Sequence, residues 1–304
     1  MTAIPSTSSN SPAKSLSTYA RNVFSQFGED GIIERILELI PDRNHWCVEF
    51  GAWDGIFLSN TFNLIKNHGF KAVLIEPDTA KFRELQRNLE TYDATLINEF
   101  VTFEGQNTLD NLLGATKIPK DFDFLSIDID GNDYYVFESL GTYRPRLVCI
   151  EFNPSIPNEV DYVQPRDFHI KRGASALSLV NLAKSKRYEL VSSSHANLMF
   201  VDALYFSHLG LENNQLENLR DDRNSRVFAF VGYDGTICLS KPLNLPWHDI
   251  TVSQSRLQVL PRILRRYIGD YGVLQKILFG LFLAIDDPSR FRAELIRQAR
   301  KLIG

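Results

Sequence analysis

Apolar runs alternate with amphipathic segments along most of the chain. Five runs have the length and the β-branched content of buried strands, and the segments between them carry apolar residues at helical spacing. The runs are HWCVEFG (45–51), FKAVLIEP (70–77), ATLINEFVT (94–102), FDFLSIDID (122–130) and RPRLVCIEFN (144–153). Strands that alternate with helices typically form a parallel sheet covered by helices on both faces. The pattern therefore predicts an α/β fold.

The sheet is expected to end in a hairpin. The stretch YELVSSSHANLMFVDALYF (188–206) contains two apolar runs joined by a tight turn at SHAN. A hairpin after five strand–helix units places an antiparallel strand in an otherwise parallel sheet. Among the helices, residues 28–40 end before Pro41, and residues 59–69 have Ser59 as a candidate N-cap and Gly69 as a stop signal.

Three segments are expected. Residues 1–20 are rich in Ser, Thr and Pro and are predicted to be a flexible leader outside the fold. Residues 21–207 form the main domain. Residues 208–304 form an appendage with a hairpin around Asp234-Gly235 and a basic, helical stretch from 250 to 304. That stretch is interpreted as helices packed on the domain or on a second copy, with peripheral contact to a membrane surface as the alternative.

Composition narrows the function classes. The chain is 44% hydrophobic and 23% charged, with a formal charge of -4, which does not suggest a nucleic-acid binder. Its three cysteines have no CxxC spacing, so we expect a reducing, cytoplasmic environment with neither a disulfide nor a zinc site. No run approaches the roughly 18 apolar residues of a transmembrane helix.

Polar residues stand where the five predicted strands end. These are Glu49, Glu76, Asn98 with Glu99, Asp128 with Asp130, and Glu151 with Asn153. The carboxyl ends of parallel strands meet at one edge of a sheet, where open α/β folds bind their ligands. The sequence therefore predicts a ligand crevice lined by acids and amides.

The glycines after the first strand differ from a dinucleotide fingerprint. The sequence reads E-x-G-x-x-x-G from Glu49 to Gly55, with Trp53 between the glycines, instead of G-x-G-x-x-G. Glu76 follows Gly51 by 25 residues, close to the separation at which such folds bind ribose with a carboxylate. This favours a ligand with a ribose and without a pyrophosphate.

The motifs VEFGAWDG, LIEP, SIDIDGND and CIEFNP, in this order, resemble those of class I S-adenosylmethionine-dependent methyltransferases, most closely the FkbM-like group. The resemblance spans residues 24 to 206. Glu49 replaces the family's leading Asp, Trp53 replaces its Asn, and the fourth motif has shorter acids. It implies a Rossmann-like, mostly parallel seven-stranded sheet with an antiparallel terminal hairpin.

The resemblance also implies S-adenosylmethionine as cofactor. The methionine part of the cofactor would contact the first-strand motif. Its ribose would be bound by Glu76, and its adenine would lie near the third strand end. The residues implied in the cofactor site are Gln26, Glu49, Gly51, Asp54, Gly55, Glu76, Asn98 and Asp128. Glu99, Glu29 and Asp30 are further candidates, although acids in the first turn of a helix are also favoured by its dipole.

The acids of the fourth strand suggest how an acceptor could be deprotonated. Residues two apart on a strand share a face, so Asp128 and Asp130 are expected to lie together as base and support. Two close carboxylates share a proton or a cation, which makes Asp128, Asp130 and Glu151 a candidate Mg²⁺ site. Asp133 is expected to cap the next helix. His169 is a second candidate base, and Lys171 and Arg172 are candidates for binding an anionic acceptor.

We therefore predict an S-adenosylmethionine-dependent methyltransferase that acts on a hydroxyl of a small molecule or glycan. Two alternatives remain open. In the first, the chain is a catalytically idle module of this fold. In the second, it is a metal-dependent enzyme that uses the same acidic crevice.

Overall fold

The computed structural model describes residues 15–303, which form two compact units. The first unit ends at Ser225 and the second begins at Arg226. The first unit reaches beyond the expected boundary at residue 207 because hydrogen bonds hold residues 208–225 to the segment after the fifth strand. The Arg220 guanidinium donates to the carbonyls of Pro154 and Ile156, and the Asp222 carboxylate accepts from the Asn158 N–H.

The first unit contains the predicted seven-stranded sheet. Its strands are β1 (Trp46–Phe50), β2 (Lys71–Ile75), β3 (Ala94–Ile97), β4 (Phe124–Ile127), β5 (Leu147–Glu151), β6 (Tyr188–Ser193) and β7 (Asn197–Asp202). They lie in the order β3-β2-β1-β4-β5-β7-β6, and β7 alone runs antiparallel to both of its neighbours. The mostly parallel sheet with an antiparallel terminal hairpin is thus confirmed.

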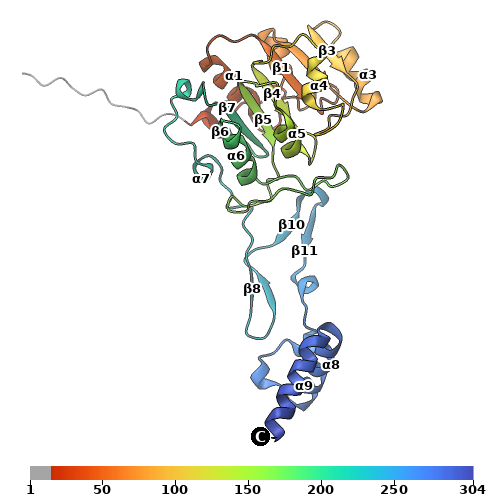
Figure 1. The fold of residues 1–304 in the computed structure, drawn as a ribbon. Helices are drawn as coiled ribbons and strands as arrows, with labels where there is room; N and C mark the ends of the chain where they lie inside the picture. Colours follow the sequence, from red (N-terminus) through yellow and green to blue (C-terminus); the bar gives the residue numbers. More distant parts are fainter. Residues whose placement is uncertain (1–14, 304) are drawn as a thin grey trace, which may run out of the picture. The chain divides into compact units, whose positions relative to one another are not determined.

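Six main helices cover the sheet (Figure 1). They are α1 (Glu29–Leu39), α2 (Phe62–His68), α3 (Thr79–Asn88), α4 (Leu109–Gly114), α5 (Asp133–Ser139) and α6 (Ala176–Ser185). Side chains alternate along β1, so that Cys47 belongs to one apolar cluster and Val48 and Phe50 to another. The first cluster includes residues of α1, α2 and α3, and the second includes residues of α4, α5 and α6. The sheet is therefore sandwiched between two helical layers.

The parallel strands end level with one another. Phe50, the last residue of β1, pairs with Ile75 at the end of β2 and with Ile127 at the end of β4. The chain leaves β3 and returns to β4 on the other side of β1, so the strand order reverses between β1 and β4. Ligands of open α/β sheets bind at such a switch point, and the residues after β1 and β4 face it.

Strand β4 is shorter than predicted. It ends at Ile127, because the Asp133 carboxylate accepts hydrogen bonds from the N–H groups of Ile129 and Gly131 and draws the chain into a turn. Asp130 has a positive φ of 55° in this turn. The expectation that strand geometry aligns Asp128 and Asp130 is therefore wrong, and Asp133 organises the turn instead of capping α5 with its side chain.

The N-terminal boundary also differs from expectation. Of the predicted leader, residues 1–14 lie outside the described residues. The remainder includes a short 3₁₀ helix, η1 (Leu16–Tyr19), whose Leu16 is buried in the same cluster as α1. The Tyr19 and Arg21 backbones lie against Gly31, where a Cβ atom would be 2.1 Å from the Tyr19 carbonyl oxygen. The burial of Leu16 and the backbone hydrogen bonds of Arg21 with Gly28 and Gly31 hold this segment to the fold, and glycine at position 31 permits the close approach.

The second unit begins with two small hairpins. Strands β8 (Ala229–Val231) and β9 (Ile237–Leu239) pair antiparallel around Asp234 and Gly235, as predicted. Strands β10 (Leu243–Leu245) and β11 (Ile250–Val252) form a second pair that was not predicted from the sequence. Residues 254–270 form 3₁₀ turns, among them η5 (Arg262–Leu264). The expected helical stretch is therefore confined to α8 (Val273–Asp286) and α9 (Pro288–Ile303).

Within the described residues, no helix combines the length and the hydropathy needed to cross a membrane.

Candidate active site

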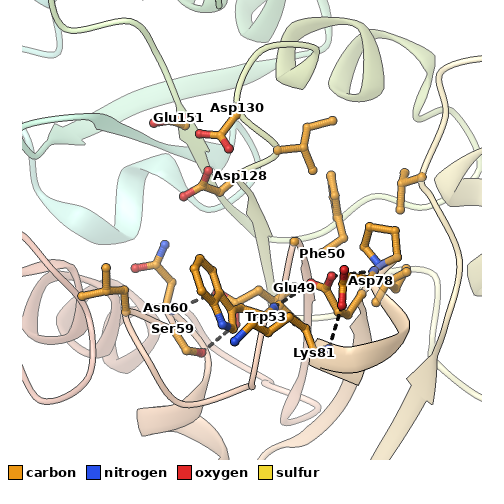
Figure 2. A pocket seen from close by; sticks show the side chains of 18 of the residues that line it. Glu49, Phe50, Trp53, Ser59, Asn60, Asp78, Lys81, Asp128, Asp130 and Glu151 are labelled. Carbon is orange, nitrogen blue, oxygen red and sulfur yellow. Dashed lines mark hydrogen bonds between the residues drawn. The ribbon is translucent and has the colours of Figure 1, made fainter. Parts of the chain in front are cut away.

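A crevice of about 560 Å³ opens at the switch point of the sheet. This volume lies in the usual range for small-molecule sites. The predicted residues that line it are Gln26, Glu49, Gly51, Glu76, Glu99, Asp128, Asp130, Glu151 and Lys171. Figure 2 shows Asp128, Asp130 and Glu151 grouped on one side, and Trp53, Asp78 and Lys81 on the other. The ends of β1, β2, β4 and β5 thus contribute to one cavity, as predicted from the polar residues at the strand ends.

Glu76 is a fixed acceptor in the wall of the crevice. One carboxylate oxygen accepts from the Trp53 N–H at 2.8 Å, and the other accepts from the Asp78 N–H at 2.8 Å. The side chain is buried, and each oxygen keeps a further lone pair. The Asn98 side chain donates to the Glu76 carbonyl and steadies this strand end from behind. Glu76 is therefore held in place to accept hydrogen bonds from a ligand such as a vicinal diol.

The two glycines after β1 have different roles. A Cβ atom at Gly51 would lie 2.2 Å from the carbonyl oxygen of Asp128, so only glycine lets β1 and β4 close up at the switch point. A Cβ atom at Gly55 would instead meet the side chains of Leu85 and Leu89 at 2.5 and 2.6 Å. Gly55 therefore allows α3 to pack, and it does not line the crevice.

Glu49 organises the loop before α2. Its carboxylate accepts from the hydroxyls of Ser59 and Thr61, both at 2.6 Å, and from the Asn60 N–H at 2.9 Å. Burial raises its pKa, against the effect of these hydrogen bonds. The Ser59 hydroxyl also accepts from the N–H of Phe62, the first residue of α2, although the N-cap position is Thr61 and not Ser59 as predicted. Glu49 thereby places Ser59 and Asn60 in the crevice wall.

Three carboxylates converge at the ends of β4 and β5. Oxygens of Asp128, Asp130 and Glu151 all lie within 4.8 Å of one another. Asp128 remains open to the crevice, but the crevice walls exclude much of the water around its carboxylate. This desolvation, together with the negative charges of Asp133 and Asp130, raises the pKa of Asp128 to about 7. Desolvation and the charge of Asp128 raise the pKa of Glu151 further. At neutral pH the pair of Asp128 and Glu151 therefore retains a proton.

Lys171 supplies a positive charge beside this cluster. Its amino group lies 3.8 Å from the Asp130 carboxylate, and both side chains are well exposed. The proximity offsets part of the charge repulsion between the acids. The segment that carries Lys171 is held by the Gln164 side chain, which accepts from the N–H groups of Arg172 and Gly173.

Strained backbone positions gather around the crevice. Trp53 and Leu58 have positive φ values of 50° and 57°, which bulky residues rarely adopt, and Asp130 has a φ of 55°, which Asp tolerates better. The exposed Trp53 ring lies under the Lys81 amino group, 4.8 Å from the ring centre, and contacts the exposed Phe57 edge to face. These contacts keep an aromatic surface at the mouth of the crevice.

Several predicted residues, all in the described part of the chain, do not line the crevice. Asp54 accepts from the N–H groups of Ile56 and Phe57 and shapes their turn. Asn98 lies behind Glu76, and Gly55 lies against α3. His169 is exposed on the segment after β5, where its N–H donates to the Asp167 carboxylate. The geometry thus gives His169 no position beside the acids.

The acids at the start of α1 tie loop 21–28 to the fold. The Asp30 carboxylate accepts from the N–H groups of Val23, Phe24 and Ser25. Glu29 is fully buried and accepts from the Ser194 hydroxyl at 2.6 Å and the Asn197 amide at 3.1 Å. Both acids are therefore structural, and they hold the loop whose Gln26 lines the crevice.

A set of lining residues on loops was not predicted from the sequence. They are Phe57, Leu58, Ser59, Asn60, Asp78, Lys81, Phe100 and Val101. Only part of this set had a signal in the sequence, through the acids that bind it: Glu49 accepts from Ser59 and Asn60, and Glu76 accepts from the Asp78 N–H. Asp78 has a structural role of its own, because its carboxylate caps α3 by accepting from the N–H groups of Ala80 and Lys81.

Comparison with known proteins gives one family match. Residues 104–172 match the family model described as the methyltransferase FkbM domain. A comparison with curated proteins found no match.

Three solved structures illustrate what this chain is similar to. TrmK of M. capricolum, in complex with S-adenosylhomocysteine, is 12% identical with a TM-score of 0.34, and the match covers 56% of this chain and 67% of TrmK. A SAM-dependent methyltransferase from Aquifex aeolicus is 11% identical with a TM-score of 0.33, and the match covers 55% of this chain and 87% of that protein. An S-adenosylmethionine-dependent methyltransferase from Clostridium acetobutylicum is 9% identical with a TM-score of 0.35, and the match covers 57% of this chain and 88% of that protein. At these values the likeness says nothing about the substrate of this chain.

The family match covers the segment in which Asp128, Asp130, Glu151 and Lys171 lie. Over residues 104–172, it confirms the resemblance to the FkbM-like group of methyltransferases.

Proposed function

We infer that the crevice binds S-adenosylmethionine and that the chain transfers a methyl group to a hydroxyl of a small molecule or glycan. The observation that carries this proposal is the presence, in one crevice, of a fixed acceptor, Glu76, and a carboxyl of raised pKa, Asp128. The first suits a ribose diol, and the second suits removal of a proton near neutral pH.

The residues of the crevice fit the chemistry of the cofactor. Glu76 would hold the ribose hydroxyls, and Ile75, Phe100 and Val101 offer apolar surface for a base. Gly51 leaves the switch point free of a side chain, and the carboxylates of Glu49 and Asp128 favour a positively charged group nearby. When bound, S-adenosylmethionine supplies a methyl group on a positively charged sulfur.

Asp128 and Glu151 are proposed to manage the acceptor's proton. The ionised Asp128 would accept the hydroxyl proton as the acceptor oxygen gains the methyl group, and the electron pair of the broken carbon–sulfur bond would remain on the sulfur of the departing S-adenosylhomocysteine. Glu151, whose pKa is raised further, keeps its own proton and supports Asp128. An exposed carboxyl of ordinary pKa would be a weaker base at neutral pH. His169 is not assigned this role because it does not line the crevice.

The mouth of the crevice supports an acceptor with an apolar face and hydroxyls. Trp53, Phe57 and Phe100 are all exposed by between 46% and 60% and line the crevice. Aromatic faces of this kind pack against the C–H surface of a sugar ring or against a planar ring.

All three cysteines are free and lie in the described chain, which supports the predicted cytoplasmic location.

The proposal is tested first by isothermal titration with S-adenosylmethionine and S-adenosylhomocysteine. Binding of both is expected, and a Glu76→Gln variant should bind more weakly. Absence of binding by the parent protein would overturn the proposal. Binding followed by no methyl transfer to any of a panel of hydroxyl compounds would instead favour the idle binding module.

The three converging carboxylates favour a second candidate, a Mg²⁺-dependent enzyme. Their oxygens lie close enough to share a hard divalent cation. Lys171 argues against it, because a cation beside Asp130 already offsets the negative charge. Titration with Mg²⁺ alone distinguishes the two candidates. Saturable binding that Asp130→Asn abolishes would support the metal, whereas the methyltransferase proposal expects cofactor binding that added Mg²⁺ leaves unchanged.

A further inference from the structure

The two units differ sharply in charge. Residues 1–225 contain 21 Lys or Arg and 31 Asp or Glu, a formal charge of -10. Residues 226–304 contain 12 Lys or Arg and 6 Asp or Glu, a formal charge of +6. The overall charge of -4 hides this difference, which gives the second unit the sign that attracts an anionic surface.

The second unit also exposes an apolar row on α8. Val273, Leu274, Ile277, Leu281 and Ile285 are exposed by 77%, 59%, 56%, 58% and 85%. At 100° per residue these positions fall within an arc of about 120° on one side of the helix. Lys276, which is exposed, lies beside this arc. Water-exposed apolar rows of this size normally mark a contact surface.

The opposite side of α8 is already used for packing. Leu283 is buried, the Phe279 ring contacts Tyr271, and the Tyr271 hydroxyl bonds to the Leu264 carbonyl. Helix α9 also lies beside α8 (Figure 1). The unit thus has a small core of its own that fixes the helix and leaves the row outside it.

Basic residues flank further exposed apolar residues in the segment before α8. Arg262 and Arg266 are exposed, and Ile263 and Tyr267 beside them are exposed by 47% and 57%. This segment contacts α8 through η5. Arginine next to exposed apolar and aromatic side chains matches the layered chemistry of a membrane interface, with acyl chains below anionic headgroups.

We propose that the second unit docks on an anionic lipid surface through the apolar row of α8 and the arginines of residues 256–266. The charge of +6 selects this occupant over a second copy of the same unit, since two such units repel each other. The docking is peripheral: the side chains of the row enter the interface and the helix lies along it.

The experiment uses the full chain and two vesicle types, phosphatidylcholine alone and phosphatidylcholine mixed with phosphatidylglycerol. Co-sedimentation is expected with the mixed vesicles, and it should weaken when salt is added. Binding to vesicles of phosphatidylcholine alone should be at least tenfold lower. Two double variants separate the contribution of the basic residues from that of the apolar row. The first, Arg262→Gln with Arg266→Gln, should lower binding by about tenfold or more, because each basic residue near the surface contributes about 1 kcal/mol.

Ile277→Gln with Leu281→Gln should lower binding similarly. Leu204→Gln, which changes a residue of the first unit that is 67% exposed, is the matched control and should bind as the parent does. Circular dichroism and thermal unfolding verify that each variant is folded. Equal binding to both vesicle types, no binding, or no loss in either double variant would overturn the proposal. So would a stable dimer, seen by sedimentation velocity without vesicles, that Ile277→Gln with Leu281→Gln dissociates.

Discussion

Gly51 lies so close to Asp128 that a Cβ atom on the glycine would be 2.2 Å from the aspartate's carbonyl oxygen. The contact joins the first residues after β1 and β4, and it fixes the floor of the crevice. Because the obstacle is backbone, a side chain at Gly51 can be accommodated only if the two strand ends separate.

Gly51→Ala is therefore expected to destabilise the fold and displace Asp128. Gly69→Ala is the matched control, since Gly69 also has a positive φ, of 66°, but a Cβ atom there would meet no other atom within 4 Å. Both variants lose the conformational advantage of glycine, about 1 kcal/mol. Gly51→Ala should lose about 1–3 kcal/mol more in the free energy of unfolding, the usual cost of overpacking. Equal losses in urea titrations of the two variants would contradict this account.

Glu76→Gln tests the fixed acceptor. An amide presents one acceptor oxygen and one donor NH₂ group, so it cannot satisfy both the Trp53 and the Asp78 N–H groups. We expect cofactor affinity to fall by tenfold or more, in keeping with about 1.5–3 kcal/mol for hydrogen bonds to a charged group. Glu104→Gln changes an exposed acid outside the crevice lining and should leave affinity unchanged. The measurement is calorimetric titration with S-adenosylhomocysteine.

The pH dependence of methyl transfer should report Asp128. Its pKa is raised to about 7, so the basic form appears as the pH rises through 7, and kcat/KM should rise with it. Asp130→Asn removes a negative charge that raises this pKa, and Asn tolerates the positive φ at this position, so the profile should move to lower pH. Lys171→Gln removes the nearby positive charge and should move it the other way. Shifts of the same sign in both variants would rule out this assignment.

Stability should depend on pH through Asp133. Burial raises the pKa of this carboxyl to about 6, above its ordinary value of 3.8. A carboxyl with a raised pKa favours the folded state fully below its unfolded pKa, and this contribution is lost as the pH rises through 6. The free energy of unfolding should therefore decline between pH 4 and 7 more steeply than in Asp133→Asn, with denaturant titrations at each pH as the measurement. Parallel curves for the two proteins would show that Asp133 does not titrate in this range.

The sheet and the acidic edge were predictable because they depend on local signals. Hydrophobic runs identified the strands, and the rule that parallel strands end at one edge brought Glu76, Asp128 and Glu151 together. The loops were not predictable in the same way. Asp54 and Asn98 have the right residue type at the right strand end, but each bonds to its own neighbourhood and leaves the crevice to Phe57, Lys81 and Phe100.

The turn after β4 illustrates the limit most clearly. A strand through Asp130 and the observed turn both bring Asp128 and Asp130 near each other, but for different reasons. The bonds from Ile129 and Gly131 to Asp133 decide the backbone path, and a pattern of alternating residues does not reveal them. The same applies to the segment of the buried Leu16, because the backbone hydrogen bonds of Arg21 with Gly28 and Gly31 leave no trace in the hydrophobic pattern.

The tie between Glu29 and the β6–β7 turn has a consequence for biosynthesis. Glu29 precedes its hydroxyl partner, Ser194, by 165 residues, so loop 21–28 leaves the ribosome long before the residues that anchor it. Because domains are made from the N-terminus onwards, the wall that carries Gln26 can be completed only after the terminal hairpin has emerged. A nascent chain halted before residue 194 would therefore expose the buried acid and an unfinished crevice to chaperones and proteases.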